Sequence, residues 1–144
     1  METSNPYEAP VHGSQLIASP KLGLKQVLFS FTGRIPRRTY WLWYVVTTVT
    51  FLLVLGLVTV VFSPPAEAGD ESVNPLGAIL MIGSLIPVMW INLALLAKRW
   101  HDRDKSAVWI LLHFIPLVGP IWTFVECGCL RGTEGHNKYG GDPT

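Results

Sequence analysis

The sequence predicts an all-α membrane protein, a small bundle of three transmembrane helices preceded by a short amphipathic helix at the membrane interface. Of the 144 residues, 49% are hydrophobic and only 15% are charged, which is too apolar for an ordinary soluble domain of this length. Three apolar blocks are each long enough to cross a hydrocarbon core of about 30 Å. Basic and aromatic side chains gather at the ends of these blocks, as is typical of helices that cross a membrane.

The first block, residues 41–62, contains no charged side chain. A helix of about 22 residues rises about 33 Å, enough to span the hydrocarbon core. A signal peptide has an apolar core of about 7–15 residues, so we interpret this block as an uncleaved anchor. Tryptophan and tyrosine favour the headgroup layer. The expected interface anchors are therefore Tyr40, Trp41, Trp43 and Tyr44.

The second and third blocks, residues 76–97 and 108–130, contain prolines that a membrane bundle tolerates, because neighbouring groups can satisfy the freed carbonyls. The length of the third block, about 23 residues, favours a full crossing. Its segment 116–120 offers an alternative, a re-entrant hairpin that would return the chain to the side it came from. We expect the membrane bundle to extend over residues 34–130.

The distribution of charge predicts the orientation, because Lys and Arg are retained on the cytoplasmic side of short-looped membrane proteins. Residues 34–38 and 98–107 are basic, whereas residues 63–75 carry three acidic side chains and no basic one. We therefore expect a multi-pass protein with a cytoplasmic N-terminus, a periplasmic or extracellular loop 63–75 and a cytoplasmic loop 98–107. If the third block crosses once, the C-terminus is periplasmic or extracellular.

The segments outside the bundle differ in composition. Residues 1–20 contain too few apolar side chains to offset the entropy of ordering, so we expect a disordered tail. Residues 21–33 place apolar side chains at helical spacing beside lysines, which predicts the interfacial amphipathic helix. Residues 131–144 form a glycine-rich tail. This tail carries a motif of turn-forming residues, namely Asn137, Tyr139, Gly140 and Asp142.

The strongest candidate site lies on the cytoplasmic rim. Arg99, Asp102 and Arg103 are three and four residues apart, so a continuing helix would place them on one face. Paired N–H donors of arginine hold phosphate oxygens well, which predicts a site for an anionic group. The alternative is a retention signal with self-neutralising ion pairs. The candidate residues for anion, lipid or partner binding are Arg34, Arg37, Arg38, Arg99, His101, Asp102, Arg103 and Ser106.

Other chemistries find less support. The four histidines lack a paired spacing, and Cys127 and Cys129 lack a second cysteine pair, so we expect no metal site and no cofactor. Ser106 has no nucleophile elbow around it. The net charge of +1 argues against nucleic-acid binding. His113 and Glu126 lie within the third block, where ionisable groups suggest function, but their spacing places them on nearly opposite faces of a straight helix.

Three stretches of the sequence form a distinctive set. They are F-S-F-T-G-R-I-P-R-R-T-Y-W (29–41), K-R-W-H-D-R-D-K-S-A-V-W (98–109) followed by I-P-L-V-G (115–119), and G-T-E-G-H-N-K-Y-G-G-D-P (132–143). Together they resemble DUF805, a family of small bacterial inner-membrane proteins of unknown function. The resemblance implies a membrane fold and a bacterial inner-membrane location but no activity. The family usually has arginine where this chain has Lys98 and Lys138, which weakens the case for bidentate anion binding at those two positions.

Three classes of function follow. The leading hypothesis is a non-enzymatic module whose cytoplasmic rim binds anionic lipid headgroups or a partner protein. The second is a homo-oligomeric transporter or channel for a small solute or ion, lined by Asn92 and His113. The third is an enzyme acting on a lipid phosphate with His101 as acid or base, which the lack of a nucleophile or metal set disfavours.

Overall fold

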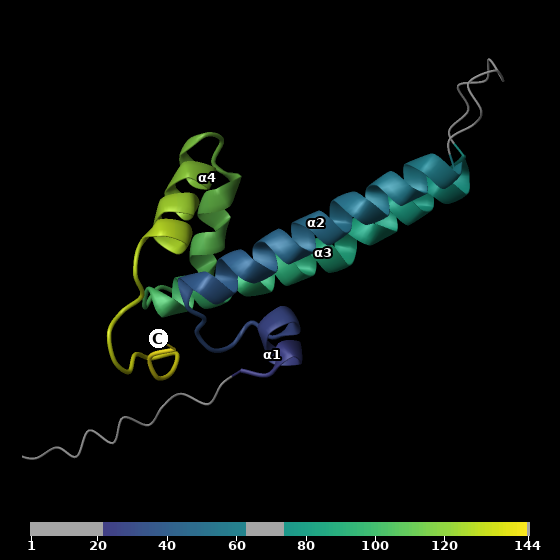
Figure 1. Ribbon diagram of the computed structural model, residues 1–144. Coiled ribbons are helices and arrows are strands. Elements are labelled where there is room, and N and C mark those ends of the chain that lie inside the picture. Colours follow the sequence, from purple (N-terminus) through teal and green to yellow (C-terminus); the bar gives the residue numbers. More distant parts are fainter. Residues whose placement is uncertain (1–21, 63–73, 144) are drawn as a thin grey trace, which may run out of the picture.

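Two long antiparallel helices dominate the computed structural model, which describes residues 22–62 and 74–143. They are α2 (Arg37–Phe62) and α3 (Pro75–Asp102), and they lie side by side along their whole length (Figure 1). Both are long and apolar enough to cross a membrane, and only 6% and 11% of their most apolar windows are buried within the protein. Such exposure suits lipid rather than water. The expected tail 1–20 and most of the loop 63–75 lie outside the described residues.

The described part of the chain is otherwise helical, without strands; its single β-bridge joins Asn137 and Gly140. Asn74 caps α3, because its side chain accepts a hydrogen bond from the Leu76 N–H at 3.0 Å and Pro75 fixes the first helical residue. At its other end α3 continues through Asp102. The helix thus continues beyond the apolar span 76–97, as the one-face arrangement of Arg99 and Asp102 requires, and residues 98–102 stay helical because the surrounding chain supplies polar partners.

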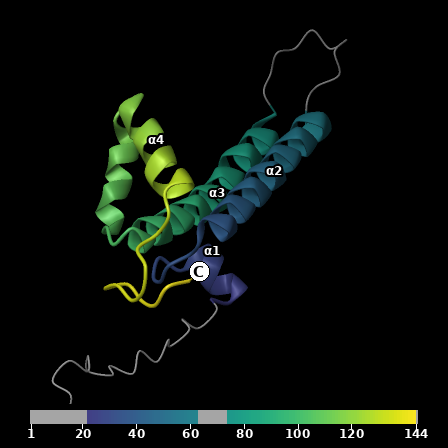
Figure 2. The ribbon, with the colours of Figure 1, turned by 60° about the vertical axis from the view of Figure 1, so that its left-hand side comes forward.

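The last nine residues of α3, Ala94–Asp102, are all buried, whereas Gly77 is the only buried residue in the rest of the helix. We call these nine residues and the segments packed around them the hub. In two views, α1 and the C-terminal segment lie below this end of the α2–α3 pair, and the region of α4 rises beside it (Figures 1 and 2). The described part of the protein is thus a largely exposed apolar helix pair with its packed core at one end.

A short helix, α1 (Leu24–Phe29), lies within the range 21–33 expected for the amphipathic helix. Its buried Val27 packs with Ile35 and Leu95 in the hub. The helix ends four residues before Gly33, the expected stop. The backbone carbonyls of Val27 and Ser30 instead accept hydrogen bonds from the Lys98 ammonium, which fixes the chain as it leaves the helix.

The third apolar block is a hairpin and not a single helix. It comprises the 3₁₀ helix η2 (Ala107–Phe114), the α-helix α4 (Val118–Thr123) and a π-helical turn η3 (Phe124–Cys129). The expected crossing by residues 108–130 is therefore wrong, and the alternative of a turn at 116–120 describes the fold. A residue that precedes a proline seldom adopts helical backbone, so the helix breaks at Ile115. Leu117 then has a positive φ of 64°, and the chain reverses its direction there.

The hairpin brings the C-terminal tail back to the side of the hub. Asn137 Nδ2 donates to the His101 carbonyl at 2.9 Å, and the Thr133 N–H donates to the Asp102 carbonyl at 2.8 Å. The expectation that the tail lies across the membrane from residues 98–107 was therefore wrong. The two sequence motifs, on α3 and in the tail, belong to one structure.

This arrangement predicts the labelling pattern of single cysteines. Cys129 is exposed, whereas Cys127 is buried and its burial raises the pKa of the thiol to about 12, so a chain with Cys129 replaced by serine should not react. In that background, Asp104→Cys and Lys138→Cys should react with a membrane-impermeant thiol reagent from the same side. Ala68→Cys, in the connection between α2 and α3, should react from the other side. Labelling of positions 104 and 138 from opposite sides in intact and lysed cells would contradict the hairpin.

Candidate functional site

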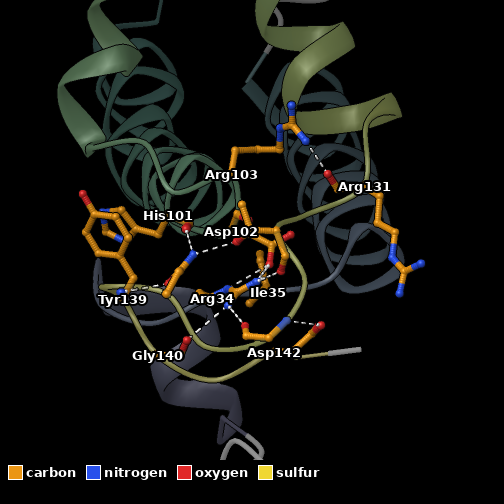
Figure 3. A network of polar contacts seen from close by, with 12 residues as sticks. Arg34, Ile35, His101, Asp102, Arg103, Arg131, Tyr139, Gly140 and Asp142 are labelled. Carbon is orange, nitrogen blue, oxygen red and sulfur yellow. Dashed lines mark hydrogen bonds and ion pairs between the residues drawn. The ribbon is translucent and has the colours of Figure 1, made fainter. Parts of the chain in front are cut away.

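The centre of the hub is a buried carboxylate shared by two arginines. Asp102 is 2% exposed, Arg34 5% and Arg99 fully buried. Arg34 Nε donates to Asp102 Oδ1 at 3.1 Å (Figure 3). Arg99 Nη1 is paired with Asp102 Oδ2. Arg34 precedes α2, whereas Arg99 and Asp102 are one turn apart on α3, so the carboxylate joins the start of one long helix to the end of the other.

The remaining donors of Arg34 hold the C-terminal tail. Its Nη1 donates to the carbonyls of Gly135 at 2.7 Å and Gly140 at 3.1 Å, and its Nη2 donates to the carbonyl of Thr133 at 2.5 Å. The tail approaches so closely at Gly132 that a Cβ there would overlap the Asp102 carboxylate. The tail is therefore a docked part of the fold.

Arg99 connects the hairpin in the same way. Its Nε donates to the Cys127 carbonyl at 2.7 Å and its Nη2 to the Leu130 carbonyl at 3.0 Å, while its Nη1 also reaches the Ile35 carbonyl at 3.1 Å. One buried side chain thus contacts two separate segments besides its own helix, the end of the hairpin and the segment before α2.

Lys98 completes a set of three buried cations. Its ammonium donates to the carbonyls of Val27, Ser30 and Ala94, at 2.9 Å for Val27 and 3.3 Å for Ala94. Of the groups that accept hydrogen bonds from Lys98, Arg34 and Arg99, only the Asp102 carboxylate carries a full negative charge. The other acceptors are backbone carbonyl groups. Burial of charge is costly unless the donors are partnered, and each side-chain nitrogen of these three cations has at least one partner.

His101 lies beneath the C-terminal motif. The rings of His101 and Tyr139 stack with centroids 3.9 Å apart and 10° between their planes, and His101 Nδ1 lies 3.3 Å from the Gly33 carbonyl (Figure 3). Asp142 Oδ2 accepts a hydrogen bond from the Gly135 N–H at 3.2 Å, and Asn137 and Gly140 pair through their backbones. The motif folds as a compact turn that covers the histidine.

A second ionic cluster lies at the root of the hairpin. The Glu126 carboxylate accepts from Lys105 Nζ at 2.8 Å and from Arg103 Nε at 3.1 Å. Lys105 Nζ also lies 5.4 Å and 4.9 Å from the ring centroids of Trp100 and Trp109. Burial alone would raise the pKa of Glu126, but the hydrogen bonds from Lys105 and Arg103 hold that pKa below its usual value.

The other predicted site residues are distributed around this core. Arg37 and Arg38 are exposed at the start of α2, where Arg37 Nη1 donates to the Cys129 carbonyl at 2.6 Å. Ser106 immediately precedes η2. Asn92 donates to the Val88 carbonyl within α3, and His113 is exposed in η2. Among the residues that the structure describes, no group of three or more His, Cys, Asp or Glu side chains could hold a metal ion.

The four aromatic residues at the start of α2 also contribute to the fold. Trp41 Nε1 donates to the Gly128 carbonyl at 3.1 Å, and its ring meets that of Phe124 edge-on at 5.7 Å. Tyr40 stacks on Tyr44, and Tyr40 and Trp43 pack against the core that contains Val27. Trp41 thus attaches the hairpin to α2, whereas Tyr40 and Trp43 help to hold α2 against the core.

Sequence reasoning missed two members of these clusters. Lys98 was treated as a weakened arginine, although a compact ammonium suits the two carbonyls at the end of α1 and the one in α3 that it contacts. Glu126 was placed in a spanning segment, although its chain neighbour Cys127 lies against Arg99. A run of charges that directly continues an apolar helix was the available signal that these groups are buried.

The fold and the hub define a small helical integral membrane protein. The sequence model of the family described as "Protein of unknown function (DUF805)" matches residues 28–141, and the chain belongs to this family. No solved structure matches the fold.

Curated relatives agree with that assignment. The chain is similar to the Inner membrane protein YhaI of Escherichia coli (strain K12), with 32% identity over 113 residues, 78% of this chain and 85% of the relative. It is also similar to the Inner membrane protein YhaH of the same strain, with 33% identity over 114 residues, 78% of this chain and 86% of the relative. The Uncharacterized protein YiiR of that strain is 27% identical over 143 residues, covering 83% and 89% of the two chains.

The shared carboxylate predicts a large effect on stability. Asp102→Asn leaves two buried guanidinium groups without a counter-charge, so we expect the free energy of unfolding to fall by about 3–5 kcal/mol. Asp104→Asn is the matched control, because Asp104 is half-exposed and lies 3.9 Å from Lys138, and it should cost less than about 1 kcal/mol. Thermal unfolding in detergent measures both. Equal effects of the two substitutions would argue against the central role of Asp102.

The second cluster predicts a dependence on pH. The folded pKa of Glu126 lies below its unfolded value, so its stabilising contribution is complete above the unfolded pKa of about 4.3 and is lost as the pH falls through the folded pKa. Between pH 6 and pH 3, the midpoint of thermal unfolding should therefore fall more for the unaltered protein than for Glu126→Gln. The measured quantity is the difference in unfolding midpoint between the two proteins across a pH series. Parallel curves would show that Glu126 does not cause the pH dependence.

Proposed function

We propose that this protein is a non-enzymatic module of the bacterial inner membrane that binds anionic lipid headgroups through exposed arginines at its cytoplasmic end. The observation that carries the proposal is a division among the basic residues. Arg34, Lys98 and Arg99 are saturated by the protein's own carbonyls and Asp102, whereas Arg37 and Arg38 are exposed where α2 begins. The buried set builds the hub, and the exposed pair meets the membrane surface.

The orientation of this end follows from charge. The described basic residues gather at the hub end of the α2–α3 pair, which favours a cytoplasmic hub with both the N-terminal side and the C-terminal tail inside. The names of YhaI and YhaH as inner membrane proteins support the same location for this chain. At 1.5 Å per residue, α2 and α3 rise about 40 Å, so the buried end of α3 extends beyond a hydrocarbon core of about 30 Å into the headgroup layer.

The hairpin enters the membrane from the cytoplasmic side without crossing it. Both of its ends lie at the hub, and its tip is apolar and exposed, with Phe114 75% and Leu117 80% accessible. The eight residues of η2 rise about 16 Å, roughly half of the hydrocarbon core. Polar backbone at the tip is tolerable in lipid only where local turns satisfy it, and the Gly119 N–H donates to the Ile115 carbonyl at 2.9 Å.

The other two classes of function find less support in the geometry. His101 is 8% exposed and lies under Tyr139, so a substrate phosphate would reach it only after the tail moved. A transport path requires further copies of the chain, and Asn92 already bonds within its own helix. An anionic surface, by contrast, needs no rearrangement of the hub to meet Arg37 and Arg38.

The proposal predicts that charge at two positions governs lipid preference. Arg37→Gln with Arg38→Gln should weaken partition of phosphatidylglycerol onto the detergent-purified protein by about 2 kcal/mol, or about 1 kcal/mol for each basic residue. Arg37→Lys with Arg38→Lys keeps the charge and should retain binding, which separates electrostatic attraction from the hydrogen bond to Cys129. Lipid retained per protein, measured by native mass spectrometry, is the readout. Unchanged retention in the glutamine variant, with insertion intact, would favour a protein partner at this surface.

A further inference from the structure

An apolar groove runs along the outer side of the hairpin and ends at the second ionic cluster. The groove has a volume of about 440 Å³ and is lined by Leu117, Val118, Ile121, Trp122, Val125 and Glu126. These residues recur at intervals of four along α4 and η3, so they form one continuous helical face. Glu126 is the only charged member and lies at the hub end of the groove, about 13 Å along the helix from Leu117.

The ionic groups at this end are of both signs and within reach of the surface. The side chains of Arg103 and Lys105 are 25% and 28% exposed, and that of Glu126 is 12% exposed. A carboxylate offers about four acceptor positions, and Lys105 and Arg103 occupy two of those on Glu126. The cluster can therefore accept another N–H donor while its cations contact an anion.

We propose that this groove binds a phospholipid with a phosphoethanolamine headgroup. The acyl chain lies along Val118, Ile121 and Val125. Arg103 and Lys105 contact the phosphate oxygens, and Glu126 accepts a hydrogen bond from the headgroup ammonium. The order of charges in the site, two cations flanking a carboxylate, complements one phosphate and one primary ammonium. The inference rests on the membrane location of the hairpin proposed above and is independent of Arg37 and Arg38.

Other headgroups match the cluster less well. Phosphocholine has the same charges, but its trimethylated ammonium has no N–H to donate to Glu126. Phosphoglycerol has no cation, so Glu126 would face only hydroxyl groups and a phosphate. Charge-assisted hydrogen bonds are the stronger class of hydrogen bond in proteins, which makes the primary ammonium the distinguishing group.

The test is a titration of the delipidated, detergent-purified protein with phosphatidylethanolamine, phosphatidylcholine and phosphatidylglycerol of identical acyl chains. Native mass spectrometry measures the lipid bound at each concentration. Phosphatidylethanolamine should bind about tenfold more tightly than phosphatidylcholine, the effect of one charge-assisted hydrogen bond. Equal binding of these two lipids by the unaltered protein would overturn the proposal without any substitution.

Variants locate the site. Glu126→Gln should lower phosphatidylethanolamine binding to the level of phosphatidylcholine. Ile121→Trp fills the groove without touching the ionic cluster and should weaken both lipids. Leu111→Trp is its matched control, because Leu111 in η2 is 64% exposed and Ile121 is 65% exposed. Equal losses from the two tryptophan variants would also overturn the proposal.

The proposal that Arg37 and Arg38 bind anionic headgroups can fail independently of the groove proposal. Arg37→Gln with Arg38→Gln should leave the preference for phosphatidylethanolamine over phosphatidylcholine intact while reducing phosphatidylglycerol binding. Loss of the ethanolamine preference in this double variant would place the headgroup site at the start of α2 and would exclude the groove. Retention of that preference, together with undiminished phosphatidylglycerol binding, would support the groove and count against the arginine rim.

Discussion

The fold depends on one buried carboxylate, Asp102, which two buried guanidinium groups share. Arg34 and Arg99 could not be buried at this end of α3 if no negative charge lay between them, because an unpaired charge in a dry environment costs several kcal/mol. Once they are buried, their other N–H groups must also be satisfied. The carbonyls that accept these hydrogen bonds belong to the tail, the hairpin and the segment before α2. The need to satisfy two buried arginines therefore orders most of the chain outside the long helices.

This requirement also explains why the hub is tightly packed while the long helices are not. In lipid, apolar side chains need no protein neighbour, so most of α2 and α3 can face acyl chains. A cation at the headgroup level can be satisfied by water, lipid phosphate or protein carbonyls. Here Lys98, like the two arginines, takes protein carbonyls, and it holds the C-terminal end of α1. Arg37 and Arg38 differ because they are exposed at the start of α2, although Arg37 also donates to one carbonyl, that of Cys129.

The sequence predicted the long helices well because their signal is local: apolar length, aromatic residues and charge at the ends. It predicted the wrong path for the third block because apolar length alone cannot distinguish one crossing from a hairpin. The prolines there are tolerated in either fold. The sequence singled out Arg99, His101 and Asp102 and, separately, the C-terminal motif, but the favoured crossing placed the two groups on opposite sides of the membrane, whereas in the structure they meet. Their burial could not be predicted, because it depends on carbonyls supplied by segments far away in the sequence.

The three stretches that resemble the DUF805 family are the segments that meet in the hub. Residues 29–41 supply Arg34, residues 98–109 supply Arg99 and Asp102, and residues 132–143 supply the carbonyls that Arg34 binds. Arginine, histidine and aspartate would suggest a binding site if they lay on a surface. Here their hydrogen-bonding groups have partners within the protein, so these residues serve the fold. The stretches that carry the family resemblance therefore build the hub of this chain, and the family description names no ligand. Arg37 and Arg38 are exposed at the start of α2, and the Glu126 carboxylate is bonded by Lys105 and Arg103, so these side chains are the ones on which the proposals above rest.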